Sequence, residues 1–241
     1  AFIRHSVFEA VEKIAAAGYQ GVELLADIPH LYIHTLRELD VQRLKEVIQR
    51  TGIEVANING NTVRGYYGRG SNEPLFEPCL TDPDPEVRRW RVDYTKRCVD
   101  LAKSLGCQNV SVTSGPIQPD TTPEESTDYL RESLRELIDY AEDKGIYVGL
   151  EYEPGLLIES CAELVGIIRD VGSTFLGANL DLGHSHVLGE DPLEVINSLY
   201  GKIFHIHLED IKDRRHYHLI PGLGDMDFEY LLSLLNRRSY G

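Results

Sequence analysis

The chain has 241 residues, of which 42% are hydrophobic, and it carries a formal net charge of −15 at pH 7. That length suits one large globular domain, and no apolar run approaches the roughly 18 residues that a membrane-spanning helix needs. The negative net charge argues against partners such as duplex nucleic acid or an anionic membrane, because a protein binds these largely through clustered Lys and Arg on its own surface. The four cysteines show no CxxC spacing and are too few for a disulfide framework, which favours a reducing cytoplasm.

Amphipathic segments with helical periodicity alternate along the chain with short apolar runs typical of buried strands. In chain order the expected elements are helix 6–17, strand 21–26, helix 40–51, strand 53–59, helix 84–105, strand 109–114, helix 124–144, strand 147–152, helix 159–171, strand 175–181, helix 191–199, strand 203–208 and helix 227–237. Glycines follow several helices, as in RTGIEV, SLGCQNV and DKGIYVGL, where a left-handed C-cap is needed. This alternation predicts a parallel sheet with crossover helices.

Two architectures fit a parallel sheet of this kind, an open doubly wound sheet and a closed barrel. No GxGxxG or Walker loop follows a strand, so the nucleotide-binding form of the open sheet lacks support. A barrel gathers its active site at the carboxyl ends of its strands. Polar residues recur at the expected strand ends, namely Glu23, Asn57, Asn59, Ser114, Glu151, Asp181 and His207. We therefore predict an α/β TIM barrel, with residues 1–241 as a single domain.

The expected strands are too few for a complete barrel. Seven helices but only six strands are expected, and a helix stands at each end of the chain. A complete (β/α)8 barrel has eight parallel strands. The sequence thus predicts a barrel that lacks its first and last strands and forms a fragment of a longer polypeptide.

Histidines and carboxylates concentrate in the second half of the chain. Six of the nine histidines lie between residues 184 and 218. Glu151, Asp181 and His207 end three consecutive expected strands, so their side chains can converge on one cation. Two oxygen donors and one nitrogen donor suit Mn²⁺, Zn²⁺, Co²⁺ or Mg²⁺, with a position left open for substrate. The alternative is that both carboxylates accept hydrogen bonds from loop amides and that His207 is a core histidine.

Four segments together resemble the xylose isomerase-like TIM-barrel superfamily: GYQGVELLAD, GIYVGLEYEPG, NLDLGHSHVLGEDP and HIHLEDIKDRRHYHLIPGLGDMDF. The resemblance runs over essentially the whole chain and is most specific in its second half. This superfamily includes isomerases and epimerases of sugars and sugar phosphates and, more distantly, endonuclease IV. The resemblance implies a divalent metal held by Glu151, Asp181, His207 and a further Glu on the eighth strand, which would lie beyond Gly241.

The resemblance also implies a metal-dependent sugar or sugar-phosphate isomerase or epimerase. Such an enzyme removes a proton next to a carbonyl, and a cation makes this accessible by stabilising the enediolate oxygens. Glu151 is the candidate catalytic base. His184, three residues after Asp181, matches the DxxH histidine of the family and is the candidate catalytic contact to a substrate oxygen. A buried structural histidine is the alternative at this position.

Endonuclease IV supplies a rival interpretation, a zinc phosphodiesterase. The histidine of DxxH and an acid-x-His pair hold additional zinc ions there, and the matching residues are His184, His216 and His218. His216 stands where that ligand is usually acidic. The alternative for His216 and His218 is a pair of hydrogen-bonded loop histidines. A third interpretation is a non-catalytic barrel protein or partner subunit that has kept the fold.

The remaining candidates are contacts to a small-molecule sugar or sugar phosphate. Glu23 is a rim contact or a salt-bridged strand end, Asn57 is a polar strand end, and Asp210 orients His207 or touches the substrate. A long segment without periodicity, residues 60–85, is typical of a lid or binding loop. Its Arg64 and Arg69 suit a phosphate or carboxylate, and its Tyr66 and Tyr67 suit a sugar face. A surface loop is the alternative, and assembly into a homo-oligomer stays open.

Overall fold

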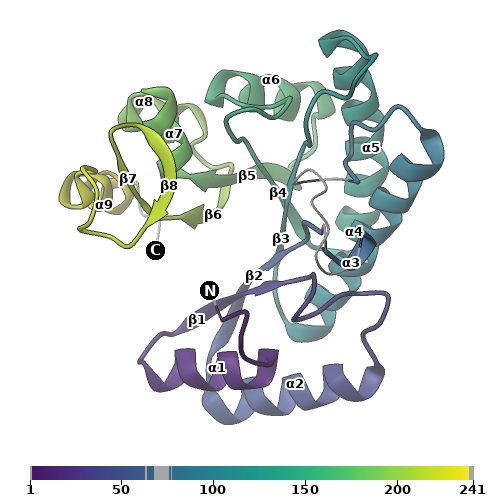
Figure 1. Ribbon diagram of the computed structural model, residues 1–241, viewed down its shortest axis with the longest axis vertical. Coiled ribbons are helices and arrows are strands. Elements are labelled where there is room, and N and C mark those ends of the chain that lie inside the picture. Colours follow the sequence, from purple (N-terminus) through teal and green to yellow (C-terminus); the bar gives the residue numbers. More distant parts are fainter. Residues whose placement is uncertain (1, 63, 68–75, 77, 239–241) are drawn as a thin grey trace.

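A computed structural model describes residues 2–62, 64–67, 76 and 78–238. Its main feature is one curved sheet of six parallel strands that pair in chain order, with helices along the outer face (Figure 1). The strands are β1 (Gly21–Leu25), β2 (Glu54–Asn59), β3 (Asn109–Thr113), β4 (Tyr147–Glu151), β5 (Leu176–Asp181) and β6 (Ile203–His207). The longer helices are α1 (Val7–Ala16), α2 (Glu38–Thr51), α4 (Pro85–Leu105), α5 (Pro123–Lys144), α6 (Cys161–Val171) and α9 (Phe228–Arg237).

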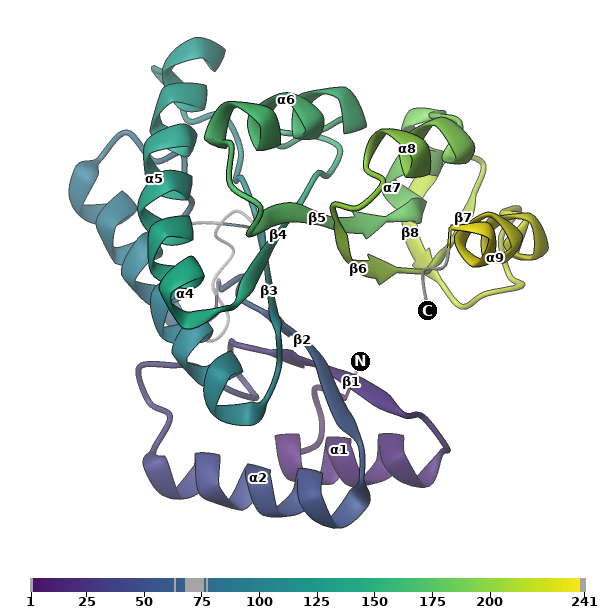
Figure 2. The ribbon, with the colours of Figure 1, turned by 180° about the vertical axis from the view of Figure 1, so that it is seen from behind.

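This architecture confirms the predicted α/β barrel class. Each strand runs parallel to the next, and β1 and β6 form the two ends of the sheet. The described residues thus place six parallel strands side by side, where a complete barrel has about eight. In the view from behind, the sheet is curved and the helices lie on its convex face (Figure 2). All six expected strands and all seven expected helices are present, with ends shifted by one or two residues.

Local sequence signals explain where the helices begin and end. Capping boxes open α1, α5 and α6, where Ser6, Thr122 and Ser160 each accept a hydrogen bond from the backbone of a glutamate three residues later. Gly52, Gly106 and Gly145 adopt the left-handed conformation directly after α2, α4 and α5. The left-handed C-caps predicted at these glycines are confirmed.

The hydrophobic core lies between the sheet and its helices. Every residue of β3 and β5 is buried, as expected for parallel strands covered on both faces. Leu134 and Leu137 of α5 pack in the same core as Val148 and Leu150 of β4. β6 differs, because all five of its residues are only half-buried. The end strand that carries His207 is therefore the only strand of the described sheet that has no buried residue.

Four short elements were not predicted. They are α3 (Arg64–Tyr67), α7 (Leu182–Leu188) and an antiparallel hairpin of β7 (Asp210–Lys212) and β8 (Arg215–Leu219). The sequence gives no turn signal between β5 and α7, because α7 begins directly where β5 ends. The expected helix 191–199 corresponds to α8 (Pro192–Ser198) and is one residue too long at each end. The structure has no helix in its described part with both the length and the apolar character needed to span a bilayer.

Candidate metal centre

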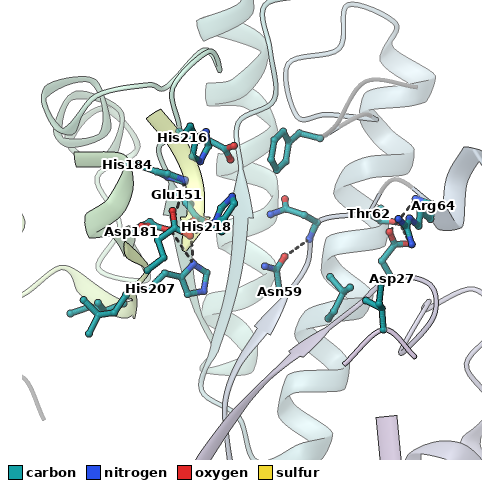
Figure 3. A pocket seen from close by; sticks show the side chains of 18 of the residues that line it. Asp27, Asn59, Thr62, Arg64, Glu151, Asp181, His184, His207, His216 and His218 are labelled. Carbon is teal, nitrogen blue, oxygen red and sulfur yellow. Dashed lines mark hydrogen bonds and ion pairs between the residues drawn. The ribbon is translucent and has the colours of Figure 1, made fainter. Parts of the chain in front are cut away.

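Three strand ends meet at one side of a pocket, as their positions in the sequence predict. Glu151, Asp181 and His207 are the last residues of β4, β5 and β6, and the register places Asp181 opposite His207. Nδ1 of His207 lies 3.1 Å from Oε1 of Glu151 and 3.9 Å from Oδ2 of Asp181. Figure 3 shows the three side chains pointing toward one another. The convergence follows from parallel pairing, which brings consecutive strand ends to the same edge.

Glu23 lies behind His207 rather than in the pocket lining. Its Oε2 is 2.8 Å from Nε2 of His207 and 3.1 Å from Nε2 of His205. The contact joins β1 to β6 across the concave side of the sheet, over a separation of 184 residues. Because Glu23 accepts a hydrogen bond from Nε2–H of His207, Nδ1 is the nitrogen left to face Glu151 and Asp181. Glu23 is thus an ion-paired strand end, which was one of its two predicted alternatives, and it is placed to orient His207.

Asn57 also lies beneath the pocket rather than in it. Its side chain is fully buried, and Nδ2 donates to Oε2 of Glu23 and to Oγ of Ser111, both at 2.7 Å. Its Oδ1 accepts from Nδ2 of Asn109 at 2.8 Å. These contacts hold Glu23 in place, so Asn57 supports the site from below. The neighbouring strand-end residue Asn59 is the one that lines the pocket.

The site gathers several carboxylates around His207, so the protonation of these side chains decides its charge. Burial disfavours the charged imidazole, but hydrogen bonds with Glu151 and Glu23 outweigh burial and raise the pKa of His207 to about 11. Burial likewise favours a neutral Glu23, yet the hydrogen bonds from His205 and His207 hold the pKa of Glu23 well below its usual range. Burial and the nearby charges of Glu209 and Glu151 raise the pKa of Asp181 to about 7. Without a metal, the His207 imidazolium is the counter-charge to these carboxylates.

His184 presents a bare nitrogen lone pair to the same pocket. Its Nδ1 donates to the carbonyl oxygen of Tyr152 at 2.8 Å, and burial lowers the pKa of His184, so its ring is neutral. Its Nε2 is buried, has no hydrogen-bond partner among the described residues, and lies 3.8 Å from Oδ2 of Asp181. A buried acceptor without a partner is costly, so binding of a ligand to this nitrogen would be favourable. His184 is therefore suited to bind a substrate oxygen or a cation.

The histidines of β8 stand beside His184. The rings of His184 and His216 are 4.8 Å apart and perpendicular. His218 is hydrogen-bonded through Nδ1 to Glu209, which raises the pKa of His218. Within the described residues, Nε2 of His216 and Oε1 of Glu209 are buried without hydrogen-bond partners. The hairpin thus brings the three histidines predicted for a second metal to one side of the pocket (Figure 3).

Two acidic residues of the site were not predicted from the sequence. Glu153 lines the pocket, and burial and the charge of Glu151 raise the pKa of Glu153 to about 8. Glu209 also lines the pocket. Each stands two residues beyond a strand end, after Glu151 and His207 respectively. A spacing of two residues in extended chain keeps Glu153 on the same side as Glu151, and Glu209 on the same side as His207. This spacing, visible in the sequence as EYE and HLE, was a signal that could have identified both carboxylates.

Asp210 organises a loop instead of touching the pocket. It is 1% exposed, and its Oδ2 accepts from the backbone nitrogens of Gly222 at 2.8 Å and Gly224 at 2.7 Å. Its Oδ1 accepts from the nitrogen of Met226 at 3.2 Å. A Cβ on Gly224 would lie 2.3 Å from Asp210 Oδ1, so glycine is required for this close approach. The predicted substrate contact of Asp210 is thus corrected, because its oxygens are committed to the loop between β8 and α9.

The pocket has a volume of about 980 Å³ and a second, less acidic wall. Asp27, Thr62 and Arg64 lie on this wall, across the pocket from the histidines (Figure 3). Oδ2 of Asp27 accepts from the backbone nitrogen of Arg64 at 3.1 Å, which fixes where α3 begins. The ring of Tyr66 packs edge-on against the ring of Trp90, with 4.6 Å between the ring centroids, instead of covering the pocket. Arg69, predicted to belong to a lid, lies outside the described residues.

The donor set of this site fits a divalent cation. One oxygen each of Glu151 and Asp181 and one nitrogen of His207 lie within 4.8 Å of one another. The unpartnered Nε2 of His184 lies 3.8 Å from Oδ2 of Asp181. Carboxylate and imidazole donors in this mixture suit Mn²⁺, Zn²⁺, Co²⁺ or Mg²⁺. A carboxylate behind a metal-ligating histidine usually sets the orientation of that ligand, and Glu23 lies in such a position behind His207.

The fold agrees with the comparisons to known proteins. A sequence profile of the family described as Xylose isomerase-like TIM barrel matches residues 11–241, and the chain belongs to this family. The fructoselysine 3-epimerase of Shigella flexneri is 25% identical over 242 residues, covering 99% of this chain and 82% of the relative. The inosose dehydratase of Clostridium perfringens is 26% identical over 271 residues, covering 98% and 80%. The crystal structure of a D-tagatose 3-epimerase-like protein, 25% identical, has a TM-score of 0.83 over 99% of this chain and 85% of that chain.

Proposed function

We propose that this chain is a divalent-metal-dependent isomerase or epimerase that acts on a sugar or sugar phosphate. The observation that carries the proposal is the convergence of Glu151, Asp181 and His207 on one pocket, with Nδ1 of His207 turned toward both carboxylates. The relatives named above support a sugar-modifying enzyme, since two of them are an epimerase of a sugar derivative and a dehydratase of an inosose.

The proposed reaction moves a proton at the carbon next to a carbonyl. Glu151 takes this proton on its carboxylate, which leaves an enediolate. Return of the proton to the neighbouring carbon, with transfer of the hydroxyl proton to the former carbonyl oxygen, moves the carbonyl, whereas epimerisation needs a second acid that delivers a proton to the opposite face of the same carbon. Nε2 of His184 accepts a hydrogen bond from a substrate hydroxyl. When bound, a divalent cation would stabilise the negative charge that develops on the substrate oxygens. Glu23 keeps His207 in the orientation that this site needs.

A second cation position is our secondary proposal. The observation that favours it is the set of buried atoms without partners in the described structure, Nε2 of His184, Nε2 of His216 and Oε1 of Glu209. His218 completes this group with Glu209 and His216. Two or three zinc ions at this place would favour the zinc phosphodiesterase interpretation, because phosphoester cleavage uses paired metals to hold both reacting oxygens.

Metal content tests both proposals. The protein is purified and its bound metals are counted by plasma mass spectrometry, beside Asp181→Asn and the control Asp143→Asn, which makes the same change on the exposed surface of α5. We expect one ion per chain in the protein and in the control, and its loss from Asp181→Asn. Two or three ions would support the second position. The absence of metal from all three proteins would refute the metal-dependent function.

Activity is then tested on a panel of ketoses and their phosphates. The reaction is followed by NMR in deuterated water, because proton transfer through Glu151 replaces the substrate hydrogen by deuterium at the carbon next to the carbonyl. We expect exchange with the metal-loaded protein and at least a hundred-fold less with Glu151→Gln, as removal of a catalytic base typically costs about that factor or more. Phosphodiester hydrolysis without such exchange would decide for the rival function.

A further inference from the structure

Asn61, in the loop after β2, lines the pocket and is half-exposed there. It contacts Thr113, the last residue of β3, which is the register partner of Glu151 at the end of β4. Asn61 is therefore separated from Glu151 by one intervening strand, or about two strand spacings of roughly 4.8 Å each. A sugar that places its reacting carbon at Glu151 has further oxygen-bearing carbons within reach of Asn61.

The orientation of the Asn61 amide is fixed by three donors. Its Oδ1 accepts from the backbone nitrogen of Thr113 at 3.0 Å, from Oγ1 of Thr113 at 3.1 Å and from Nη2 of Arg91 at 3.2 Å. A backbone N–H and a guanidinium can only donate, so the atom that faces them must be the oxygen. The NH₂ group is consequently on the other branch of the amide. Since Oδ1 is committed to the protein, Nδ2 is the branch available to a pocket ligand.

The residue behind this amide is an unusual buried cation. Arg91 is 2% exposed and donates to three neutral oxygens, the carbonyl of Gly60 at 3.0 Å, Oγ1 of Thr95 at 2.8 Å and Oδ1 of Asn61. Burial lowers the pKa of Arg91, and the charge of Asp27 is among those that oppose this shift. The guanidinium on Oδ1 polarises the amide and strengthens the donors on Nδ2.

We propose that Asn61 is a substrate-binding residue whose Nδ2 donates a hydrogen bond to a hydroxyl oxygen of the sugar chain beyond its reacting carbon, and that Arg91 is its positioning residue. The inference rests on the proposed function, because the ligand is the sugar of that reaction. It assigns the β2 side of the pocket to recognition of the sugar chain and leaves proton transfer to the β4 side. Recognition through an oriented donor discriminates against sugars that lack the accepting oxygen.

Asn61→Asp is the informative variant. An aspartate keeps an oxygen for Thr113 and for Arg91, so the buried contacts persist, but it replaces the pocket-facing donor by an acceptor. Asn236→Asp makes the same chemical change on the exposed face of α9 and serves as the control. Binding of D-tagatose and of D-fructose to the Mn²⁺-loaded proteins is measured by calorimetry, with metal content and melting temperature recorded for each sample.

We expect wild type and Asn236→Asp to bind a ketohexose equally, and Asn61→Asp to bind it at least about ten-fold more weakly, with bound Mn²⁺ and melting temperature maintained. Equal affinity in Asn61→Asp would overturn this inference and leave the proposed function intact. Loss of Mn²⁺ from Asn61→Asp would also overturn it, since Asn61 would then support the metal site. Failure of wild type to bind either ketohexose would overturn both this inference and the sugar specificity on which it rests.

The role of Arg91 is tested by coupling. Arg91→Lys keeps the buried charge but alters the donor geometry, so it should weaken ketohexose binding in the wild-type background. In the Asn61→Asp background it should cause no further loss, because Arg91 acts through Asn61. A purely structural role would weaken binding equally in both backgrounds and would overturn the assignment.

Discussion

At the scale of single residues, proton exchange at His207 should control metal uptake. A metal ligand must be unprotonated, whereas hydrogen bonds with Glu151 and Glu23 raise the pKa of His207 to about 11 in the metal-free protein. Mn²⁺ binding at pH 8 should therefore release about one proton. Asp181, with its pKa raised to about 7, should add a second proton as the pH falls to 6. Affinity should accordingly rise with pH over this range.

Calorimetric titration with Mn²⁺ in buffers of different ionisation heat measures this release directly. The control is Asp181→Asn, which is expected to lose the bound ion and should therefore give no Mn²⁺ binding heat in any buffer. Binding heats that do not depend on the buffer at either pH would show that His207 is neutral in the metal-free protein, and the pairing with Glu23 and Glu151 would need another explanation.

Glu23 makes a second prediction at this scale. Glu23→Gln removes the charge that holds Nε2 of His207 and that also pairs with His205. Loss of such an orienting partner typically weakens metal binding by about 10–100-fold, and we expect that range for Mn²⁺. Glu54→Gln, on an exposed residue at the start of β2, is the matched control. If Glu23→Gln retained full Mn²⁺ affinity, the orientation of His207 would have to come from other contacts.

At the scale of elements, Asp210 holds the connection between β8 and α9. Asp210→Asn places an NH₂ group where the carboxylate accepts from backbone nitrogens of Gly222, Gly224 and Met226. At least one buried N–H then loses its acceptor, so the free energy of unfolding should fall by about 1–3 kcal/mol. Urea denaturation measures the change. Mn²⁺ affinity should stay within about two-fold, because Asp210 is a structural group; a large loss of affinity with unchanged stability would restore the predicted contact with the site.

The long elements could be predicted because their signals are local. Apolar runs identify the six strands, and capping residues with helical periodicity identify α2, α4 and α5. The hairpin of β7 and β8 has no such signal. Its strands, of three and five residues, are polar, and they exist through pairing with each other. α7 was missed because it continues directly from Asp181, whose side chain accepts from the nitrogen of Gly183 and caps it.

Some features of the site could likewise be predicted from the sequence, and others could not. The convergence of Glu151, Asp181 and His207 follows from strand order alone, which is a property of the sequence pattern. The position of Glu23 does not follow from strand order, because its contact with His207 joins the first strand to the sixth. Asn57 looked equivalent to Asn59, yet a bulge in the register between Val22 and Glu23 accompanies its burial. Contacts that depend on curvature of the sheet cannot be read from one strand at a time.

At the scale of the whole molecule, a bound metal should tie the end of the sheet together. β6 is half-buried throughout, while β5 beside it is fully buried, so His207 belongs to the strand with the weaker enclosure. A cation shared by β4, β5 and β6 should stabilise the protein by about 2.7 kcal/mol at a hundred-fold excess over the dissociation constant. For a domain of this size that corresponds to a rise in melting temperature of roughly 5–10 °C.

Hydrogen exchange tests where this stabilisation acts. With Mn²⁺, the amides of β6 should become more protected, whereas those of β2, which carries none of the three ligands, should change little beyond the global increase in stability. The matched control is Asp181→Asn, in which neither the melting temperature nor the protection of β6 should respond to Mn²⁺. An equal gain in protection for β2 and β6, or a melting temperature that Mn²⁺ raises in Asp181→Asn as well, would place the stabilising ion elsewhere on this acidic molecule. Selective protection of β6 would instead show that the residues proposed for chemistry also complete the half-buried end of the sheet.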